Sequence, residues 1–189
     1  MNEIDTIPVY SKVYKGHRIR VTYDEFPTDP QLDENMDDPS ILLVSHHQKY
    51  GENHDLPTHD AVRAYAAQHC YVIYNVLLHE HSSLAYSLHA YDDRWMPGQF
   101  GYLLVKLKSI DACATHTEKL VKLATAWLQT YQAWSNGDVY QYAIYHIIDC
   151  EHCKHSHDKL VDSLCGIYGA EEALAQAKAY VDELAKETT

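Results

Sequence analysis

IPVYSKVYKGHRIRVTY, residues 7 to 23, holds two runs of β-forming residues on either side of Lys15-Gly16. In the second run, Arg18, Arg20 and Thr22 alternate with Ile19, Val21 and Tyr23. Because successive side chains of a strand point to opposite faces, this alternation predicts a strand with one buried face. The stretch therefore predicts a β-hairpin, and with it an antiparallel sheet.

The same reading of periodicity, extended along the chain, predicts further strands and helices. We expect strands over residues 40–47, 70–81, 83–91, 100–107 and 138–149. We expect helices over residues 59–69, 109–134 and 171–186, and a short helical piece over residues 158–165. Thr58 is the expected N-cap of the first helix.

Strands joined by hairpins, with helices grouped late in the chain, are typical of an α+β domain. We expect a largely antiparallel sheet with helices packed on one face. Strict β–α alternation is missing, which leaves a doubly wound parallel sheet as the alternative. With 189 residues the chain is near the usual size of one domain, so we expect a single domain over residues 1–189.

The composition, with 46% hydrophobic and 22% charged residues, is that of a globular protein. The N-terminal stretch lacks the basic flank and apolar run of a secretory signal. No stretch approaches the roughly 18 apolar residues that span a bilayer, so we expect no membrane contact. Five cysteines, an odd number, favour free or metal-bound thiols in a reducing cytoplasm.

The chain is acidic, with 27 Asp and Glu against 15 Lys and Arg and a formal charge of −12. Nucleic-acid binding depends on clustered cations, so this balance argues against direct binding to DNA or RNA. An acidic surface instead attracts basic protein surfaces. Protonation of all 14 histidines would change the formal charge from −12 to +2, so the acidic character fades as the pH falls through about 6.5.

One stretch, DEFPTDPQLDENMDD at residues 24 to 38, holds seven acids and no Lys or Arg. It is read either as a solvated loop or as a contact surface that imitates phosphates in a basic channel of another protein. The second reading takes five residues of this stretch and two of a later loop as partner contacts: Asp29, Asp33, Glu34, Asp37, Asp38, Asp92 and Asp93.

CEHCKHSH, residues 150 to 157, concentrates soft metal ligands. The spacing of Cys150 and Cys153 lets both thiolates reach one tetrahedral zinc ion. A structural site needs two more ligands, for which His155, His157 and Cys165 are the candidates. The alternative is a polar loop with packed thiols and solvated histidines. Structural zinc is the only cofactor that we expect.

His79 and His81 lie two apart in an expected strand and so project from the same face, with Glu80 on the other. A metal-dependent hydrolase or nuclease would need a third ligand, from His46 or from residues 150–157. The chain has no HExxH, GxSxG or GxxxxGK[ST] motif to support another catalytic class.

Three groups of stretches carry a family resemblance. They are KGHRIRVTYDEFP with SHHQKYG; EHSSLAYSLHAYDDRWMPGQFGYLLV; and TYQAWSNGDVYQYAIY with VDSLCGIYG. In this order they resemble an uncharacterised family of bacteriophage and plasmid proteins with EHSG…W.SGQ.G, TGDVYG and DSC.GFYG motifs. The matching residues are Glu80, His81, Ser82, Trp95, Gly98, Gln99, Gly101, Gly137, Asp138, Val139, Tyr140, Asp162, Ser163, Gly166, Tyr168 and Gly169. The chain departs from the pattern at Met96, where an acid is usual, and at Leu164-Cys165.

The resemblance implies an accessory protein of a mobile element, acting in the cytoplasm of a bacterial host. Together with the acidic stretches, it predicts a non-enzymatic protein that binds and inhibits a host defence protein with a basic surface, as an anti-restriction or anti-CRISPR protein does. A His/Cys zinc hydrolase and a phage structural or assembly protein are the alternatives. The sequence leaves the oligomeric state open.

Overall fold

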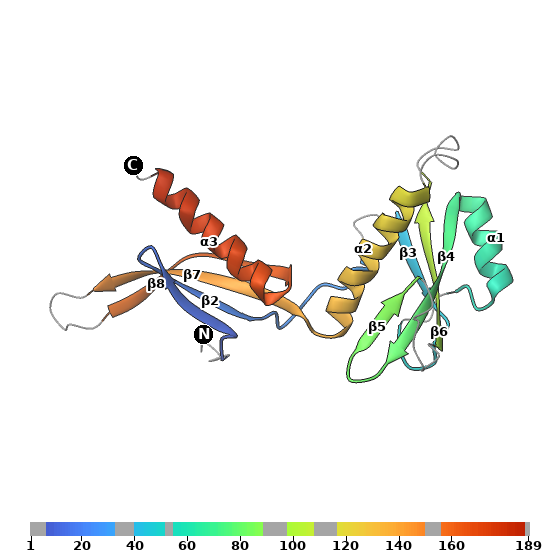
Figure 1. Cartoon of the computed structure of the whole chain (residues 1–189), viewed down its shortest axis with the longest axis horizontal. Coiled ribbons are helices and arrows are strands. Elements are labelled where there is room, and N and C mark those ends of the chain that lie inside the picture. The colour runs from blue at the N-terminus through green and yellow to red at the C-terminus, as the bar shows by residue number, and fades with distance from the viewer. Residues whose placement is uncertain are drawn as a thin grey trace. The chain divides into compact units, whose positions relative to one another are not determined.

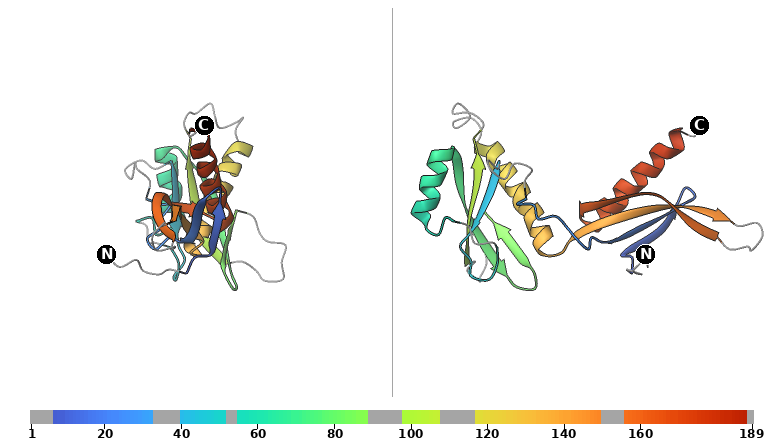
Figure 2. Two further views of the ribbon diagram at one scale, coloured as in Figure 1. Left: turned by 90° about the vertical axis from the view of Figure 1, so that its left-hand side faces the viewer. Right: turned by 180° about the vertical axis from the view of Figure 1, so that it is seen from behind.

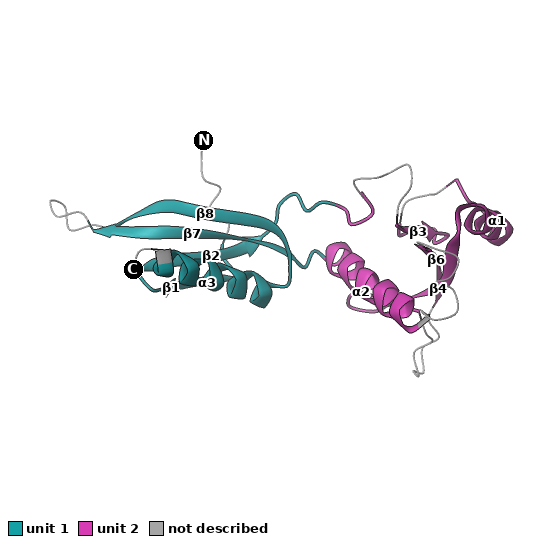
Figure 3. Cartoon of the chain, turned by 90° about the horizontal axis from the view of Figure 1, so that it is seen from above, with its two compact units in different colours: residues 1–28, 137–189 teal, residues 29–136 magenta. Residues whose placement is uncertain are grey.

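The computed structural model describes residues 7–32, 40–51, 55–88, 98–107, 117–149 and 156–187. These ranges contain eight strands and three helices (Figure 1). The chain divides into two compact units (Figure 3). The first unit is made of residues 1–28 and 137–189, and the second unit is residues 29–136.

The first unit is a four-stranded antiparallel sheet with one helix. Its strands, in spatial order, are β1 (Tyr10–Tyr14), β2 (His17–Tyr23), β7 (Val139–Asp149) and β8 (Ser156–Tyr168). Helix α3 (Ala170–Glu187) packs on one face of this sheet and buries Val181 against Ile19, Val21 and Ile144. One face is therefore covered by a helix, as the alternation in residues 17 to 23 requires.

The hairpin predicted around Lys15-Gly16 is confirmed, with residues 10–14 paired to residues 17–21. Both turn residues have positive φ, 45° at Lys15 and 77° at Gly16. This is the backbone of a two-residue primed turn, whose twist matches that of the paired strands. Glycine takes this conformation without strain, whereas Lys15 takes it at a cost of about 1 kcal/mol.

The helical piece predicted over residues 158–165 is wrong, because these residues form the middle of strand β8. The pairing of β8 with β7 shifts register twice, between Tyr140 and Tyr142 and between Ile144 and Tyr145. Each shift leaves an extra residue in β8, and such bulges interrupt the two-residue alternation. The strand pattern is thus hidden in the sequence.

The second unit is another four-stranded antiparallel sheet. Its strands, in spatial order, are β3 (Ile41–Ser45), β6 (Gly98–Lys106), β4 (Tyr71–Glu80) and β5 (Leu84–Ser87). Its two helices are α1 (His59–His69) and α2 (Thr117–Ser135). Thr58 caps α1 as predicted, its hydroxyl accepting a hydrogen bond from the N–H of Ala61 at 3.2 Å.

The two helices of the second unit lie on opposite faces of its sheet (Figure 2). Phe100 and Val105 of β6 pack in the cluster that includes α2, while Tyr102 and Leu104 pack in the cluster that includes α1. Strand β6 is buried on both sides, which explains its nearly continuous apolar run. The predicted α+β class, with helices packed on antiparallel strands, is confirmed. The structure differs in having two sheets, one of them covered on both faces.

The second unit is inserted between two neighbouring strands of the first. Strands β2 and β7 pair from His17–His146 to Tyr23–Tyr140, although more than 100 residues separate them in the chain. The N–H of Asp24 donates to the carbonyl of Val139 at 2.9 Å, just beyond the last pair. Whether the two units make one domain, as expected, stays a prediction.

Candidate functional site

Most of the predicted partner contacts fall outside the described ranges. The contacts outside these ranges are Asp33, Glu34, Asp37, Asp38, Asp92 and Asp93. Asp29 is described, and its Oδ1 accepts a hydrogen bond from the N–H of Gln31 at 2.8 Å. Asp24, in the same acidic stretch, accepts from the backbone N–H groups of Phe26 and Gly166. Both carboxylates thus hold local backbone turns, and Asp24 also bonds the distant residue Gly166 of β8.

The surplus negative charge of the second unit is unevenly distributed along its chain. Residues 29–136 hold 13 Asp and Glu against seven Lys and Arg, a formal charge of −6. Five of these acids and five of the cations lie in the described ranges, which are therefore formally neutral. The other eight acids and two cations lie in residues 33–39, 52–54, 89–97 and 108–116. The whole surplus thus belongs to segments that connect strands and helices.

Four of the eight acids stand in the single segment 33–39, which has no Lys or Arg. The next residue in the chain is Ser40, which directly precedes β3. The carbonyl of Ser40 accepts a hydrogen bond from the N–H of Lys106, at the end of β6, at 2.9 Å. The residue that follows the most acidic segment is therefore held by the end of β6. The first unit, with 14 acids and eight cations, also carries −6.

The ligand-rich stretch connects β7 to β8. Outside the described ranges lie three of the predicted zinc ligands, Cys150, Cys153 and His155. The residues on either side of this stretch, Asp149 and Ser156, pair with each other. His157 is exposed and pairs with Ile148. A zinc site at Cys150, Cys153 and these histidines stays a prediction.

Cys165 lies far along the same strand as His157. Eight residues of extended chain separate the two, a distance of about 26 Å at the usual rise per strand residue. A zinc ligand bonds the ion at about 2.0–2.3 Å, so Cys165 and His157 do not share one ion. The expected helical piece would have shortened this separation, whereas the strand extends it.

His79 lies in β4 and His81 directly follows that strand, and their ring centroids are 6.5 Å apart. The Nε2 atom of His46 lies 2.7 Å from the carbonyl oxygen of Leu56 and forms a hydrogen bond with it. Nowhere in the described ranges do three or more His, Cys, Asp or Glu side chains gather in a way that could hold a metal ion.

Glu80 takes part in a polar cluster with the segment that follows β3. Its Oε1 accepts hydrogen bonds from Lys49 Nζ at 2.6 Å and from the hydroxyl of Tyr50 at 2.5 Å. The hydrogen bond from Lys49, and then that from Tyr50, lower the pKa of the Glu80 carboxyl below its usual range. The same contact with Glu80 raises the pKa of the Lys49 ammonium. Glu80 is therefore ionised and already hydrogen-bonded to Lys49 and Tyr50. It links the segment after β3 to β4 and is a poor general base at neutral pH.

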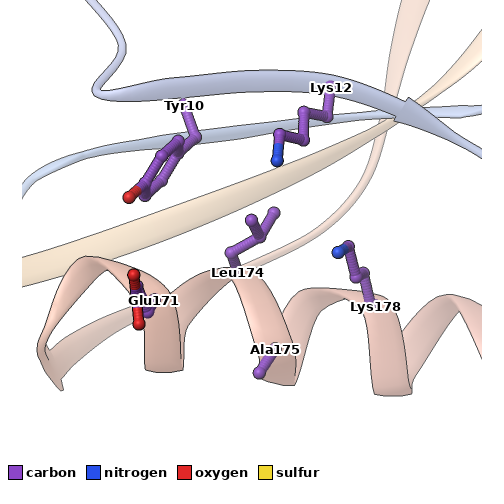
Figure 4. A pocket seen from close by; sticks show the side chains of 6 residues that line it. All are labelled: Tyr10, Lys12, Glu171, Leu174, Ala175 and Lys178. Atoms are coloured by element: carbon purple, nitrogen blue, oxygen red, sulfur yellow. The ribbon is translucent and has the colours of Figure 1, made fainter.

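A hollow of about 300 Å³ lies between β1 and α3 in the first unit (Figure 4). Its lining residues are Tyr10, Lys12, Glu171, Leu174, Ala175 and Lys178. The ammonium groups of Lys12 and Lys178 point into the space around Leu174, while Glu171 and Tyr10 lie at the other end (Figure 4). The two lysines are 166 residues apart in the chain, so sequence patterns gave no signal for this hollow.

No family model, no curated protein and no solved structure matches this chain. None of the helices in the described ranges is long and apolar enough to cross a membrane.

Proposed function

We propose that this chain is a non-enzymatic interaction protein of a mobile element that binds and inhibits a host defence protein through its acidic connecting segments. The observation that carries the proposal is the charge distribution of the second unit. Residues 33–39 alone carry −4 of its formal charge of −6, and residues 52–54 and 89–97 carry −1 each. Carboxylates concentrated in a few short segments support electrostatic recognition of a basic surface better than evenly scattered ones do.

The class of partner follows from the same chemistry. A surface that accepts closely spaced carboxylates is one that accepts phosphates, so the partner is a nucleic-acid-binding protein or complex. The resemblance to bacteriophage and plasmid proteins favours a restriction enzyme or a CRISPR effector. Asp33, Glu34, Asp37 and Asp38 are the proposed principal contacts, with Asp29, Asp92 and Asp93 around them.

The test compares capture of host proteins by the chain and by a variant with four neutralised acids, Asp33→Asn, Glu34→Gln, Asp37→Asn and Asp38→Asn. The tagged proteins are incubated with host lysate at about 50 mM and about 500 mM salt, and retained proteins are identified by mass spectrometry. We expect a nucleic-acid-binding defence protein to be retained at low salt by the natural chain and lost with the variant.

The matched control neutralises four exposed acids without a described ion pair: Glu25→Gln, Asp55→Asn, Asp138→Asn and Glu183→Gln. This control has the same net charge as the test variant, so equal losses would mean that total charge matters and that segment 33–39 does not. Capture that is unchanged in the test variant would overturn the proposed contacts. DNA cleavage by the captured enzyme then measures inhibition.

A metal-dependent hydrolase is the second candidate function, and it depends on ligands from residues 150–155, which lie outside the described ranges. The other two proposed ligands are His79 and His81. Among the described residues, no third His, Cys, Asp or Glu joins them to complete a metal site. A catalytic zinc needs three protein ligands and an open position. Nothing in the described part of the chain favours the third alternative, a phage structural or assembly protein.

A further inference from the structure

We propose that His17 and His146 form a binding site for one divalent transition-metal ion, of which Zn²⁺ is the reference case, on the first sheet. The two residues are directly opposite each other in neighbouring strands β2 and β7. Side chains of such a pair project from the same face of the sheet. This site belongs to the first unit, whereas the acidic segments belong to the second, and it does not depend on their proposed role.

The separation of the two rings fits a shared ion. Their centroids are 5.3 Å apart, with an angle of 52° between the ring planes. Two imidazoles that bind one tetrahedral ion through nitrogens about 2.1 Å from it hold their centroids about 5.2 Å apart. The other neighbouring pair, His79 and His81, has its centroids at 6.5 Å, more than 1 Å beyond this separation.

The hydrogen bond of His17 indicates the tautomer of its neutral ring. Its Nδ1 lies 3.1 Å from the carbonyl oxygen of Lys15. Because a carbonyl only accepts hydrogen bonds, Nδ1 carries the proton, and the lone pair of neutral His17 is on Nε2. A backbone carbonyl that receives the other ring N–H is the usual second partner of a metal-binding histidine. The primed turn at Lys15-Gly16 thus orients His17 as a ligand.

His146 is exposed and free to complete the pair. The only described interaction of its side chain is the ring contact with His17. On its other side it stands opposite Lys159 of β8. That ammonium weakens cation binding without blocking it, because Lys159 is exposed and its charge is screened. Two protein ligands leave the remaining positions of a tetrahedral ion to water.

The test is a Zn²⁺ titration followed by residue-resolved NMR of the imidazole nitrogens at about pH 7.5, where neutral histidine predominates. Cys150→Ser and Cys153→Ser are present throughout, to remove the predicted thiolate site. We expect Nε2 of His17 and one nitrogen of His146 to shift together, with one dissociation constant, before His79 and His81 respond. Independent shifts of His17 and His146, or saturation of His79 and His81 at the same zinc concentration, would overturn the site.

Substitutions distinguish a shared ion from weak single-histidine binding. His17→Gln should weaken zinc binding at His146 at least tenfold, and His146→Gln should do the same at His17. The second variant changes an exposed side chain and so keeps the fold. Lys159→Gln should tighten binding severalfold by removing the neighbouring charge. Unchanged affinity at the remaining histidine in both histidine variants contradicts the proposal.

Discussion

The side-chain amide of Asn136 pairs with the backbone of Leu84, accepting from its N–H at 2.9 Å and donating to its C=O at 2.8 Å. One turn earlier, at the end of α2, Gln132 accepts from the N–H of Tyr86 at 2.9 Å. Leu84 and Tyr86 belong to β5, the last strand of its sheet. Two amides thus satisfy backbone groups of an edge strand that would otherwise be open to another chain.

Removal of these amides should destabilise the protein and promote association. The variant Gln132→Ala with Asn136→Ala loses three hydrogen bonds, which we expect to lower the free energy of unfolding by about 2–3 kcal/mol. Urea unfolding measures the loss, and light scattering measures association. Gln176→Ala, which removes an exposed amide of α3 that bonds Glu172, is the control and should be nearly neutral. Equal stability of the two variants would show that the edge is held by pairing with β4 alone.

Gly101 should not tolerate a side chain. A Cβ atom at this position of β6 would lie 2.0 Å from the carbonyl oxygen of Val44 in the neighbouring strand. The obstacle is backbone, so Gly101→Ala should lower the free energy of unfolding by about 3 kcal/mol or more. Gly98 starts the same strand, and a Cβ there would meet nothing within 4 Å. Gly98→Ala should therefore unfold at nearly the natural temperature. Similar melting of the two variants would contradict this close approach of β3 to β6.

Tyr140 should make stability depend on alkaline pH. Burial, and then a hydrogen bond with Tyr23, raise the pKa of the Tyr140 phenol to about 12. A raised phenol pKa favours the neutral form in the folded state, so this stability is complete below the unfolded value of about 10. It is lost as the pH rises from about 10 through about 12. Thermal melts across this range should fall less steeply for Tyr140→Phe. A slope identical to that of the natural chain would show that Tyr140 ionises as readily when folded.

The first unit should fold without the inserted second unit. Asp24 and Val139 are joined by a backbone hydrogen bond, so a two-residue Asn-Gly turn can replace residues 25–138. The shortened chain keeps β1, β2, β7, β8 and α3, with the core around Ile19 and Ile144. We expect cooperative thermal unfolding and dispersed NMR spectra. A disordered product would mean that the two units depend on each other, as a single domain does.

The class and most elements of this fold could be predicted from local patterns. Alternation in residues 17 to 23 and the Lys15-Gly16 turn predicted the first hairpin, and Thr58 marked the start of α1. The segment 109–116 of the predicted second helix lies outside the described ranges, and α2 runs from Thr117 to Ser135. These patterns succeed because the period of a strand or helix is set by neighbouring residues.

What local patterns miss are pairings between distant residues. The bulges of β8 break the alternation that would have predicted a strand. Without that strand, the long distance between Cys165 and His157 could not be predicted either. The hollow between Lys12 and Lys178 likewise joins opposite ends of the chain.

By itself, then, the sequence determined the kind of most elements, the net charge and the segments that carry it. The tertiary structure alone decided that these elements build two sheets, with β2 beside β7 and therefore His17 beside His146. The physical reason is that a strand's own residues fix its period and its apolar face. The identity of its neighbour depends instead on how all the faces of the chain are buried together.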